Sequence, residues 1–337
     1  MKSVHRILRI PLALVIASAA VLFGQSPAQA APPPQSVNGW LQVWNYNTAR
    51  MSTGPDTDWR QFIYYITDAG RVSYRPDIVT VQEVGTDYLN LPGCENIANL
   101  LQSRTGEDYH CYETNDTGGS SIVYRTGRLS KVGEATIPLK YREFESETDC
   151  KNSTWTAQAL RLSDDKVAGK YVNVASVHLP YNGNAQDADC AWDNSKIISS
   201  ALANLGSSQM QIMGGDWNHV DAAVSGTSVN WECWYEGTTT TAGGALGNCG
   251  GSNLGWKDPQ YRKCDETNDG AYNIWKCMDN VHRTHGGTRI DFLLAKAHTA
   301  SGSGTVDYYQ AWQAAGSPGG PQKYSDHRGQ GAALKYY

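Results

Sequence analysis

The stretch Ile212-Met213-Gly214-Gly215-Asp216-Trp217-Asn218 places a carboxylate and a carboxamide two residues apart, directly after an apolar run. Because side chains alternate along a strand, Asp216 and Asn218 should point in the same direction. A strand that ends in two glycines and presents these groups side by side can hold a phosphate, a metal-bound water, or both. The alternative is a simple turn, since Gly, Asp and Asn are common turn residues. The rest of the chain decides between these two interpretations.

Residues 1–30 have the pattern of a secretory signal peptide. A positively charged start precedes an apolar stretch from Ile10 to Phe23, and Ala28-Gln29-Ala30 is an A-x-A cleavage site. The apolar stretch is too short to span a bilayer, and no later segment is apolar over such a length. We therefore expect residues 31–337 to form a secreted, monomeric protein with no stable membrane association.

The expected mature chain is acidic and shows no composition break that would divide it into domains. Removing residues 1–30 takes away three of the 28 Lys and Arg and none of the 33 Asp and Glu, which leaves a net charge of -8. An acidic chain gains little by neutralising phosphates, so any contact with a polyanion should be short, local and metal-assisted. The segment at about 225–287 is rich in Cys, Trp and Gly, and is predicted to be a disulfide-tied insertion.

Eight cysteines in an exported chain predict up to four disulfides. Proximity in the sequence suggests that Cys94 pairs with Cys111, Cys150 pairs with Cys190, and two bridges form within 233–277, although 105 pairings are conceivable. A zinc site is the alternative, disfavoured because no C-x-x-C pair is present and the compartment is oxidising. Its ligands would be Cys264, Cys277, His282 and His285.

Short apolar runs alternate with helical patterns along the chain, which favours a mixed α/β domain. Strands are predicted at 40–45, 78–82, 121–124, 157–162, 171–178, 211–215, 289–294 and 331–335. Helices are predicted at 58–69, 95–103 and 188–205.

Polar residues gather at the ends of several predicted strands. One such residue is usually a cap or a turn residue, but six such segments in one chain favour a shared site. The acids among them would repel one another if buried without partners, so they would need a shared cation or histidine partners. These acids are Glu83, Asp216, Asp291 and Asp326, and the histidines are His178 and His327.

Taken in order, these segments resemble the endonuclease/exonuclease/phosphatase superfamily, whose type member is deoxyribonuclease I. The matching segments are Trp44-Asn45, Gln82-Glu83, His178, Gly215-Asp216-Trp217-Asn218, Arg289-Ile290-Asp291 and Ser325-Asp326-His327. The resemblance implies an α/β (α+β) four-layer sandwich, in which two mixed β-sheets pack face to face with helices outside. Its active site would lie where strand ends from both sheets meet.

The resemblance also implies a role for each residue in phosphodiester hydrolysis. Glu83 would be the principal ligand of a divalent metal, and Asn45 and Asp326 would complete the site directly or through water. Oxygen ligands favour Mg²⁺, with Mn²⁺ as a substitute. Asp216 and Asn218 would orient the attacking water and the scissile phosphate.

Two histidines would share the proton chemistry under the same resemblance. Asp291 would pair with His327, raising its pKa and fixing its ring. His178 would be the general acid toward the leaving oxygen. Which group acts as the general base stays open.

The chain departs from deoxyribonuclease I around the partner of His178. That enzyme has a glutamate where this chain has Gly118-Gly119, and the nearest acids here are Glu113 and Asp116. An arginine of that enzyme is also replaced, around Trp155. The pattern is similar to the catalytic subunit of cytolethal distending toxin as well, so a weakly active toxin or binding subunit is a further alternative.

The substrate is less determined than the reaction, because the superfamily also cleaves sphingomyelin and inositol phosphates. We favour an extracellular endonuclease acting on DNA, or on RNA, since no exposed aromatic hairpin for a membrane surface is evident. Arginines that could contact a nucleic-acid backbone are Arg50, Arg60, Arg125, Arg142, Arg283 and Arg289. Separately, the oxygen-rich turn at 265–270 is a candidate structural Ca²⁺ site, although a solvated loop is favoured because its spacing does not fit an EF-hand.

Overall fold

The structure is a computed structural model that describes residues 40–54, 57–68, 75–85, 93–113, 119–141, 149–180, 187–218, 256–260, 290–297, 306–313 and 325–336. The predicted signal peptide, the alternative zinc ligands, the 265–270 turn and the predicted 225–287 insertion, apart from 256–260, lie outside these ranges. What the sequence predicts for them stays a prediction. None of the helices in the described part of the chain combines the length and apolar character needed to cross a membrane.

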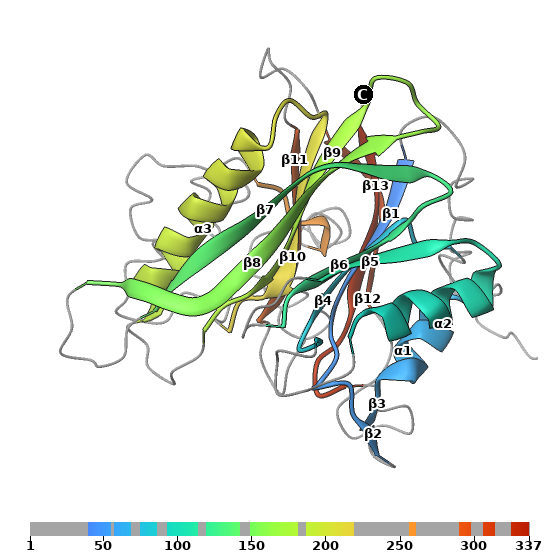
Figure 1. The fold of residues 1–337 in the computed structure, drawn as a ribbon, viewed down its shortest axis with the longest axis horizontal. Coiled ribbons are helices and arrows are strands. Elements are labelled where there is room, and N and C mark those ends of the chain that lie inside the picture. The colour runs from blue at the N-terminus through green and yellow to red at the C-terminus, as the bar shows by residue number, and fades with distance from the viewer. Residues whose placement is uncertain are drawn as a thin grey trace, which may run out of the picture. The chain divides into compact units, whose positions relative to one another are not determined.

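Two mixed β-sheets form the centre of the fold (Figure 1). The first has six strands, in the order β12 (Val306–Gln313), β13 (Gln330–Tyr336), β1 (Trp40–Asn47), β4 (Ile78–Gln82), β6 (Ser121–Arg125) and β5 (Tyr109–Glu113). The second has five, in the order β11 (Asp291–Ala297), β10 (Met210–Asp216), β9 (Tyr171–His178), β8 (Lys151–Asp164) and β7 (Leu129–Tyr141). A short ribbon pairs β2 (Thr53–Gly54) with β3 (Thr57–Asp58).

Three helices are described, and each packs on the outer face of a sheet. They are α1 (Trp59–Ile66), α2 (Glu95–Thr105) and α3 (Asp187–Asn204). Phe62 of α1 and Leu101 of α2 share a buried cluster with Trp44 of β1, whereas Ile198 of α3 packs with Met213 of β10. Figure 1 shows α3 beside the second sheet and the other two helices beside the first.

A third buried cluster joins the two sheets. It contains Leu41 and Val43 of β1 together with Leu160, Val174 and Ile212 of the second sheet. Burying apolar side chains between two sheet faces is the main stabilising contribution in such a sandwich. The four-layer α/β fold expected from the sequence is therefore confirmed.

Each sheet contains one parallel pair, and these pairs position the polar strand ends. β1 lies parallel to β4, and β9 lies parallel to β10. A parallel pair needs a crossover, which is provided here by segments that contain α1 and α3 respectively. In both pairs the carboxyl ends meet at one edge, so Asn47 is opposite Gln82 and Asp216 is opposite His178.

Two of the suggested disulfides are confirmed. Cys94, at the start of α2, pairs with Cys111 of β5, and Cys150, just before β8, pairs with Cys190 of α3. Each bridge attaches a helix to a strand of the sheet that it covers. The remaining four cysteines lie outside the described residues.

Candidate active site

Asp216 ends β10, and Gly214, two residues before it, allows the two sheets to approach closely. A Cβ atom on Gly214 would lie 2.0 Å from Thr80 Oγ1 and 3.1 Å from Asn45 Oδ1, both in the facing sheet. Real Cβ atoms do not approach other atoms so closely, so only glycine fits at this position. Gly214 thus brings Asp216 next to the strand ends of the first sheet.

Asn45 is fully buried behind the site. Its Oδ1 accepts hydrogen bonds from Thr80 Oγ1 at 2.9 Å and Gln82 Nε2 at 3.0 Å, and its Nδ2 donates to Gly215 O at 3.3 Å. These contacts tie the two sheets together. Asn45 therefore has a structural place between the sheets, and its predicted role at the site stays a prediction.

Asn47 occupies the place between the carboxylates, and the sequence analysis did not single it out. Its Nδ2 donates to Asp216 Oδ2 at 2.9 Å and to Glu83 Oε1 at 3.2 Å. β1 runs two residues beyond the predicted strand, and alternation keeps Asn47 on the same face as Asn45. The repeat Leu41, Val43, Asn45, Asn47 is the signal that could have identified it.

Glu83 follows β4 with its backbone in the left-handed region, at φ 59°. Such a conformation is uncommon outside glycine and is often found at functional sites, where surrounding contacts maintain it. Here Thr48 Oγ1 donates to Glu83 O at 2.9 Å and Asn47 holds the Glu83 side chain. The carboxylate is therefore fixed next to Asp216, with a side-chain exposure of 16%.

His327 lies among the carboxylates of the site. It pairs with Asp291, as the family resemblance implied. His327 Nδ1 is 2.8 Å from Asp291 Oδ2, and Nε2 is 3.6 Å from Asp216 Oδ2 and 3.9 Å from Asp326 Oδ1. Burial alone would lower the pKa of His327, but the charges of Asp291 and Asp216 outweigh it and raise the pKa to about 10. The ring is therefore a cation at neutral pH, held by Asp291 and directed toward Asp216.

His178 and Asn218 approach Asp216 from its own sheet. His178 Nε2 lies 3.8 Å from Asp216 Oδ2, and the backbone N–H of Asn218 donates to Asp216 Oδ1 at 2.8 Å. β10 ends at Asp216 and Asn218 has φ 53°, so strand alternation does not govern the Asn218 side chain. That side chain donates instead to Leu179 O at 2.7 Å.

The donor set fits a divalent cation. Glu83 accepts a hydrogen bond from the Asn47 amide, and Ser325, which precedes the exposed Asp326, donates to Asn47 O at 2.8 Å through its Oγ. Carboxylate and amide oxygens suit Mg²⁺ or Mn²⁺. A buried group of Asp216, Asp291 and His327 could also bind a metal ion, although its members already contact one another.

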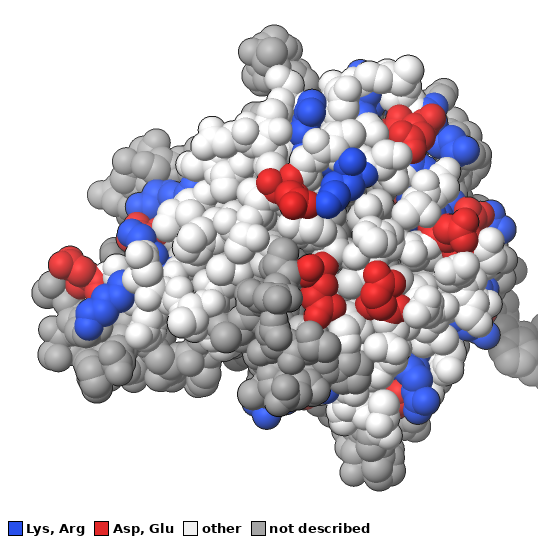
Figure 2. Space-filling model, viewed as in Figure 1, with Lys and Arg blue, Asp and Glu red and all other residues white. Residues whose placement is uncertain are grey.

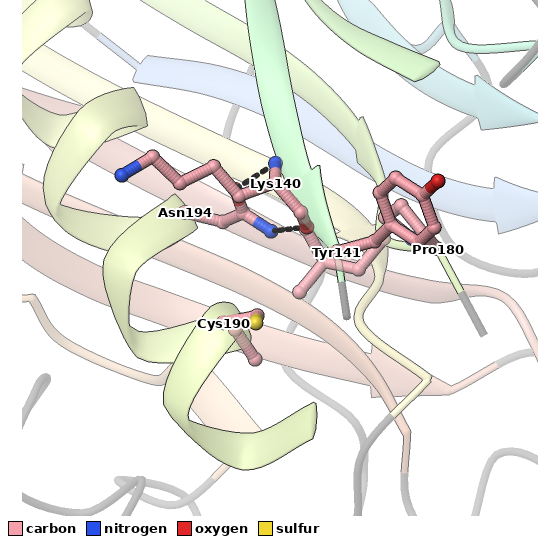
Figure 3. Close-up of a pocket in the computed structure, with 7 residues that line it drawn as sticks. Lys140, Tyr141, Pro180, Cys190 and Asn194 are labelled. Carbon is pink, nitrogen blue, oxygen red and sulfur yellow. Dashed lines mark hydrogen bonds between the residues drawn. The ribbon is translucent and has the colours of Figure 1, made fainter. Parts of the chain in front are cut away.

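A small pocket lies beside the end of β9, without including the carboxylates in its lining. Residues from β7, α3 and the segment after His178 line it: Lys140, Tyr141, Leu179, Pro180, Cys190, Ala191 and Asn194. Figure 3 shows the Asn194 side chain bonded to the backbone of Lys140, with Nδ2 donating to O at 2.9 Å and Oδ1 accepting from N at 2.7 Å. These contacts fasten α3 to β7 near the strand end that carries His178.

The chain matches the model of the Endonuclease/Exonuclease/phosphatase family over residues 66–327, which is more than half of its length. It belongs to this family. Members are hydrolases that act on phosphodiesters or phosphate esters and generally depend on divalent metals. The superfamily resemblance found in the sequence is thereby confirmed, and the polar cluster lies where the Endonuclease/Exonuclease/phosphatase fold was expected to have its active site. A comparison with curated proteins found no match to the chain.

Solved structures share the Endonuclease/Exonuclease/phosphatase fold at 15% sequence identity. Humanized D. rerio TDP2 has a TM-score of 0.54 over 88% of this chain and 99% of its own. The human Nocturnin catalytic domain has a TM-score of 0.54 over 89% and 96% of the two chains, and the mannosyl-6-phosphatase of Bacteroides thetaiotaomicron has 0.50 over 88% and 100%. At this identity the likeness shows the fold alone.

The indole of Trp155 lies beside His178. The ring of Trp155 lies 4.7 Å from the His178 ring, centroid to centroid, at an interplanar angle of 54°. Glu113, one of the two nearest acids in the sequence, instead accepts the N–H of Cys94 at 2.8 Å, and Asp116 lies outside the described residues. His178 in this member of the Endonuclease/Exonuclease/phosphatase family is thus bordered by an indole and by Asp216.

The raised pKa of His327 predicts a pH-dependent contribution to stability. A histidine whose folded-state pKa lies above the unfolded value of 6.5 stabilises the fold fully below that value, and this contribution is lost as the pH rises toward about 10. In EDTA, the difference in unfolding free energy between the native protein and His327→Gln should therefore shrink between about pH 6 and about pH 10. Urea denaturation at a series of pH values measures it, and a constant difference would contradict the assignment of the charge.

Proposed function

We propose that the chain is a secreted, divalent-metal-dependent phosphodiesterase, and more specifically an extracellular endonuclease that hydrolyses DNA. The observation that carries this proposal is the juxtaposition of Glu83, Asn47, Asp216 and the His327–Asp291 pair at one edge of the sandwich. This group combines hard oxygen ligands with a charged imidazole, as hydrolysis of a phosphodiester requires. Secretion is supported by the pattern of residues 1–30.

The chain's own groups suit the separate steps of in-line hydrolysis. A divalent cation bound by Glu83 and Asp326 would supply a Lewis acid for a phosphoryl oxygen. Asp216, held by Asn47 and by the Asn218 N–H, is placed to orient the attacking water. As the phosphorus–oxygen bond to the leaving group breaks, the protonated His327 would stabilise negative charge on the phosphoryl group.

His178 is placed to supply the proton that the leaving group needs. The leaving oxygen needs a proton as its bond to phosphorus breaks, and a buried imidazole beside Asp216 can provide one. The indole of Trp155 packs against the ring and limits its orientations. We assign His178 as the general acid and leave the identity of the general base open.

DNA is favoured as the substrate because a structure of D. rerio TDP2, which shares the fold, is described as complexed with a single-strand DNA product. The surface is not that of a protein that coats nucleic acid. Figure 2 shows basic and acidic side chains interspersed over the described part of one face, and the full chain has a net charge of -5. We therefore expect short contacts with the backbone and a weak salt dependence of binding.

The test compares substrates with the same preparation of the mature protein. Supercoiled plasmid, RNA, sphingomyelin and a phosphoinositide are incubated with Mg²⁺ or with EDTA, alongside His327→Ala. The matched control is His110→Ala, which removes a histidine with 51% side-chain exposure on β5, in the outer strand of the first sheet. We expect Mg²⁺-dependent nicking of plasmid by the native protein and by His110→Ala, and a loss of at least about 10³-fold in His327→Ala.

Each alternative gives a different result in this assay. An intact plasmid together with cleavage of a lipid would identify a sphingomyelinase or a phosphoinositide phosphatase. No metal-dependent turnover of any substrate would favour a binding or toxin subunit. Equal activity of His327→Ala and His110→Ala would refute the site.

A further inference from the structure

Arg50 lies in a strained turn directly after the strand that carries Asn47. Ala49, Arg50 and Met51 have φ values of 50°, 59° and 49°, so three consecutive non-glycine residues are left-handed. L-residues visit this region as single positions and rarely in succession, because the Cβ approaches the following carbonyl. Such strain persists only where surrounding contacts maintain it, and it often marks a functional segment.

The residues on either side of Arg50 are firmly anchored. Thr48 N donates to Gln82 O at 3.1 Å, and Thr48 Oγ1 donates to Glu83 O at 2.9 Å. Met51 N donates to Thr48 Oγ1 at 3.2 Å, and the Met51 side chain is buried. Between these anchors the Arg50 side chain is 67% exposed, so the turn directs a guanidinium outward beside Glu83.

The Arg50 guanidinium balances the charge of Glu83 without a tight bond. Arg50 Nε lies 3.8 Å from Glu83 Oε2, which is too long for a hydrogen bond, while Glu83 Oε1 accepts from Asn47. A divalent cation bound by Glu83 would satisfy the carboxylate and repel the guanidinium. Arg50 would then be available to an anion at the same edge of the sandwich.

Two other arginines of the set named in the sequence analysis are described, and both are paired with acids elsewhere. Arg60 forms two hydrogen bonds of 2.8 Å with Asp58, and Arg125 is buried in ion pairs with Asp77 and Glu107. Arg142, Arg283 and Arg289 lie outside the described residues. Among the described arginines of this set, Arg50 is thus both exposed and close to the carboxylates of the site.

We propose that Arg50 is a phosphate-binding residue that changes partners on metal binding. It neutralises Glu83 before the metal arrives, and it binds an oxygen of the substrate phosphate once Glu83 holds the cation. The planar guanidinium presents a fork of N–H donors that matches phosphate oxygens. This inference rests on the proposed phosphodiesterase function, since it assumes a metal at Glu83 and a phosphate nearby.

The test measures binding and needs no turnover. In Arg50→Gln, the affinity for Mn²⁺, followed by the electron paramagnetic resonance of the free ion, should rise about threefold at low salt, and the rise should shrink in about 0.5 M KCl. The affinity for thymidine 3′,5′-bisphosphate in the presence of Mn²⁺, measured by calorimetry, should fall about tenfold. Arg50→Lys should keep the native Mn²⁺ affinity and only part of the phosphate affinity, because lysine keeps the charge but lacks the fork of donors. Arg60→Gln is the control for loss of an exposed arginine that is paired with Asp58.

Opposite changes in the two affinities are the expected result, because a variant that merely loosens the turn would weaken both. An Arg50→Gln protein that binds either probe with unchanged affinity, or that binds both more weakly, overturns the proposal. The outcome is separable from that of the DNA assay. Opposite changes in the Mn²⁺ and bisphosphate affinities without DNA cleavage would support the role of Arg50 and refute the nuclease. DNA cleavage with unchanged affinities would support the nuclease and refute the role of Arg50.

Discussion

Asp291→Asn should lower kcat for plasmid cleavage by about 10³- to 10⁴-fold while leaving the protein folded. Asp291 Oδ2 is 2.8 Å from His327 Nδ1, and its charge helps to raise the pKa of that ring to about 10. Asparagine keeps the size of the side chain but removes the charge and presents an amide that can impose the wrong tautomer. In serine proteases the equivalent replacement costs on the order of 10⁴ in kcat.

A second measurement separates this role of Asp291 from simple damage. The pKa of His327, followed by NMR of the ring protons, should fall in Asp291→Asn, because Asp291 is the first of the three carboxylates that raise it, with Asp216 and Asp326. Asp165→Asn is the matched control. Asp165 is an exposed acid, distant from Asp291 in the sequence, and it accepts hydrogen bonds from Ser130 and Ser163. Full activity of Asp291→Asn, or an unchanged pKa of His327, would show that the pair does not act as described.

The sequence predicted the fold well where hydrophobic patterns were continuous. β9 was predicted at 171–178 and observed with the same bounds, since its buried residues form one uninterrupted run. β7 was not predicted, because it is an edge strand in which only Leu129, Ile137 and Leu139 are buried and no regular apolar pattern runs along it. Its hydrogen-bonded partner β8 maintains it, and that pairing leaves no local signature in the sequence.

The candidate site was predictable as a set of residues but not as a geometry. Matching the ordered segments selected Asn45, which proves to be a buried link between the sheets, and passed over Asn47, which contacts both Glu83 and Asp216. Asn47 lies one strand period beyond Asn45, since β1 continues for two residues beyond its predicted end. Strand ends are the least determined positions in a sequence, because side chains of the facing sheet decide where the buried face stops.

The contact between Trp155 and His178 illustrates the same limit. Trp155 was noticed only as a replacement for an arginine of a relative, whereas the structure packs its ring on His178. β8 and β9 are antiparallel neighbours whose register pairs Gln158 with Ser176, and Trp155 and His178 meet just beyond that pair. Register depends on the pairing of whole strands, which a single sequence without homologues does not reveal.

Gly214→Ala should destabilise the protein by about 2–4 kcal/mol and lower the yield of folded protein. The added Cβ would lie 2.0 Å from Thr80 Oγ1, a buried hydroxyl that also bonds Asn45, so the sheets must separate or Thr80 must lose its bond. Overpacking of a well-packed core typically costs about 1–3 kcal/mol, and a lost buried hydrogen bond adds about 1 kcal/mol. Urea denaturation gives the change in unfolding free energy.

Two further variants identify the cause of that loss. Gly133→Ala adds a methyl group 3.5 Å from Arg161 Cβ, an ordinary contact, and should change stability by less than about 0.5 kcal/mol. Thr80→Ala combined with Gly214→Ala removes the clashing hydroxyl and should recover part of the lost stability, although Thr80 Cβ would still lie 3.1 Å away. The double variant should be more stable than the sum of the two single changes in unfolding free energy predicts. If it is not, the clash between Gly214 and Thr80 is not the reason that glycine is needed at position 214.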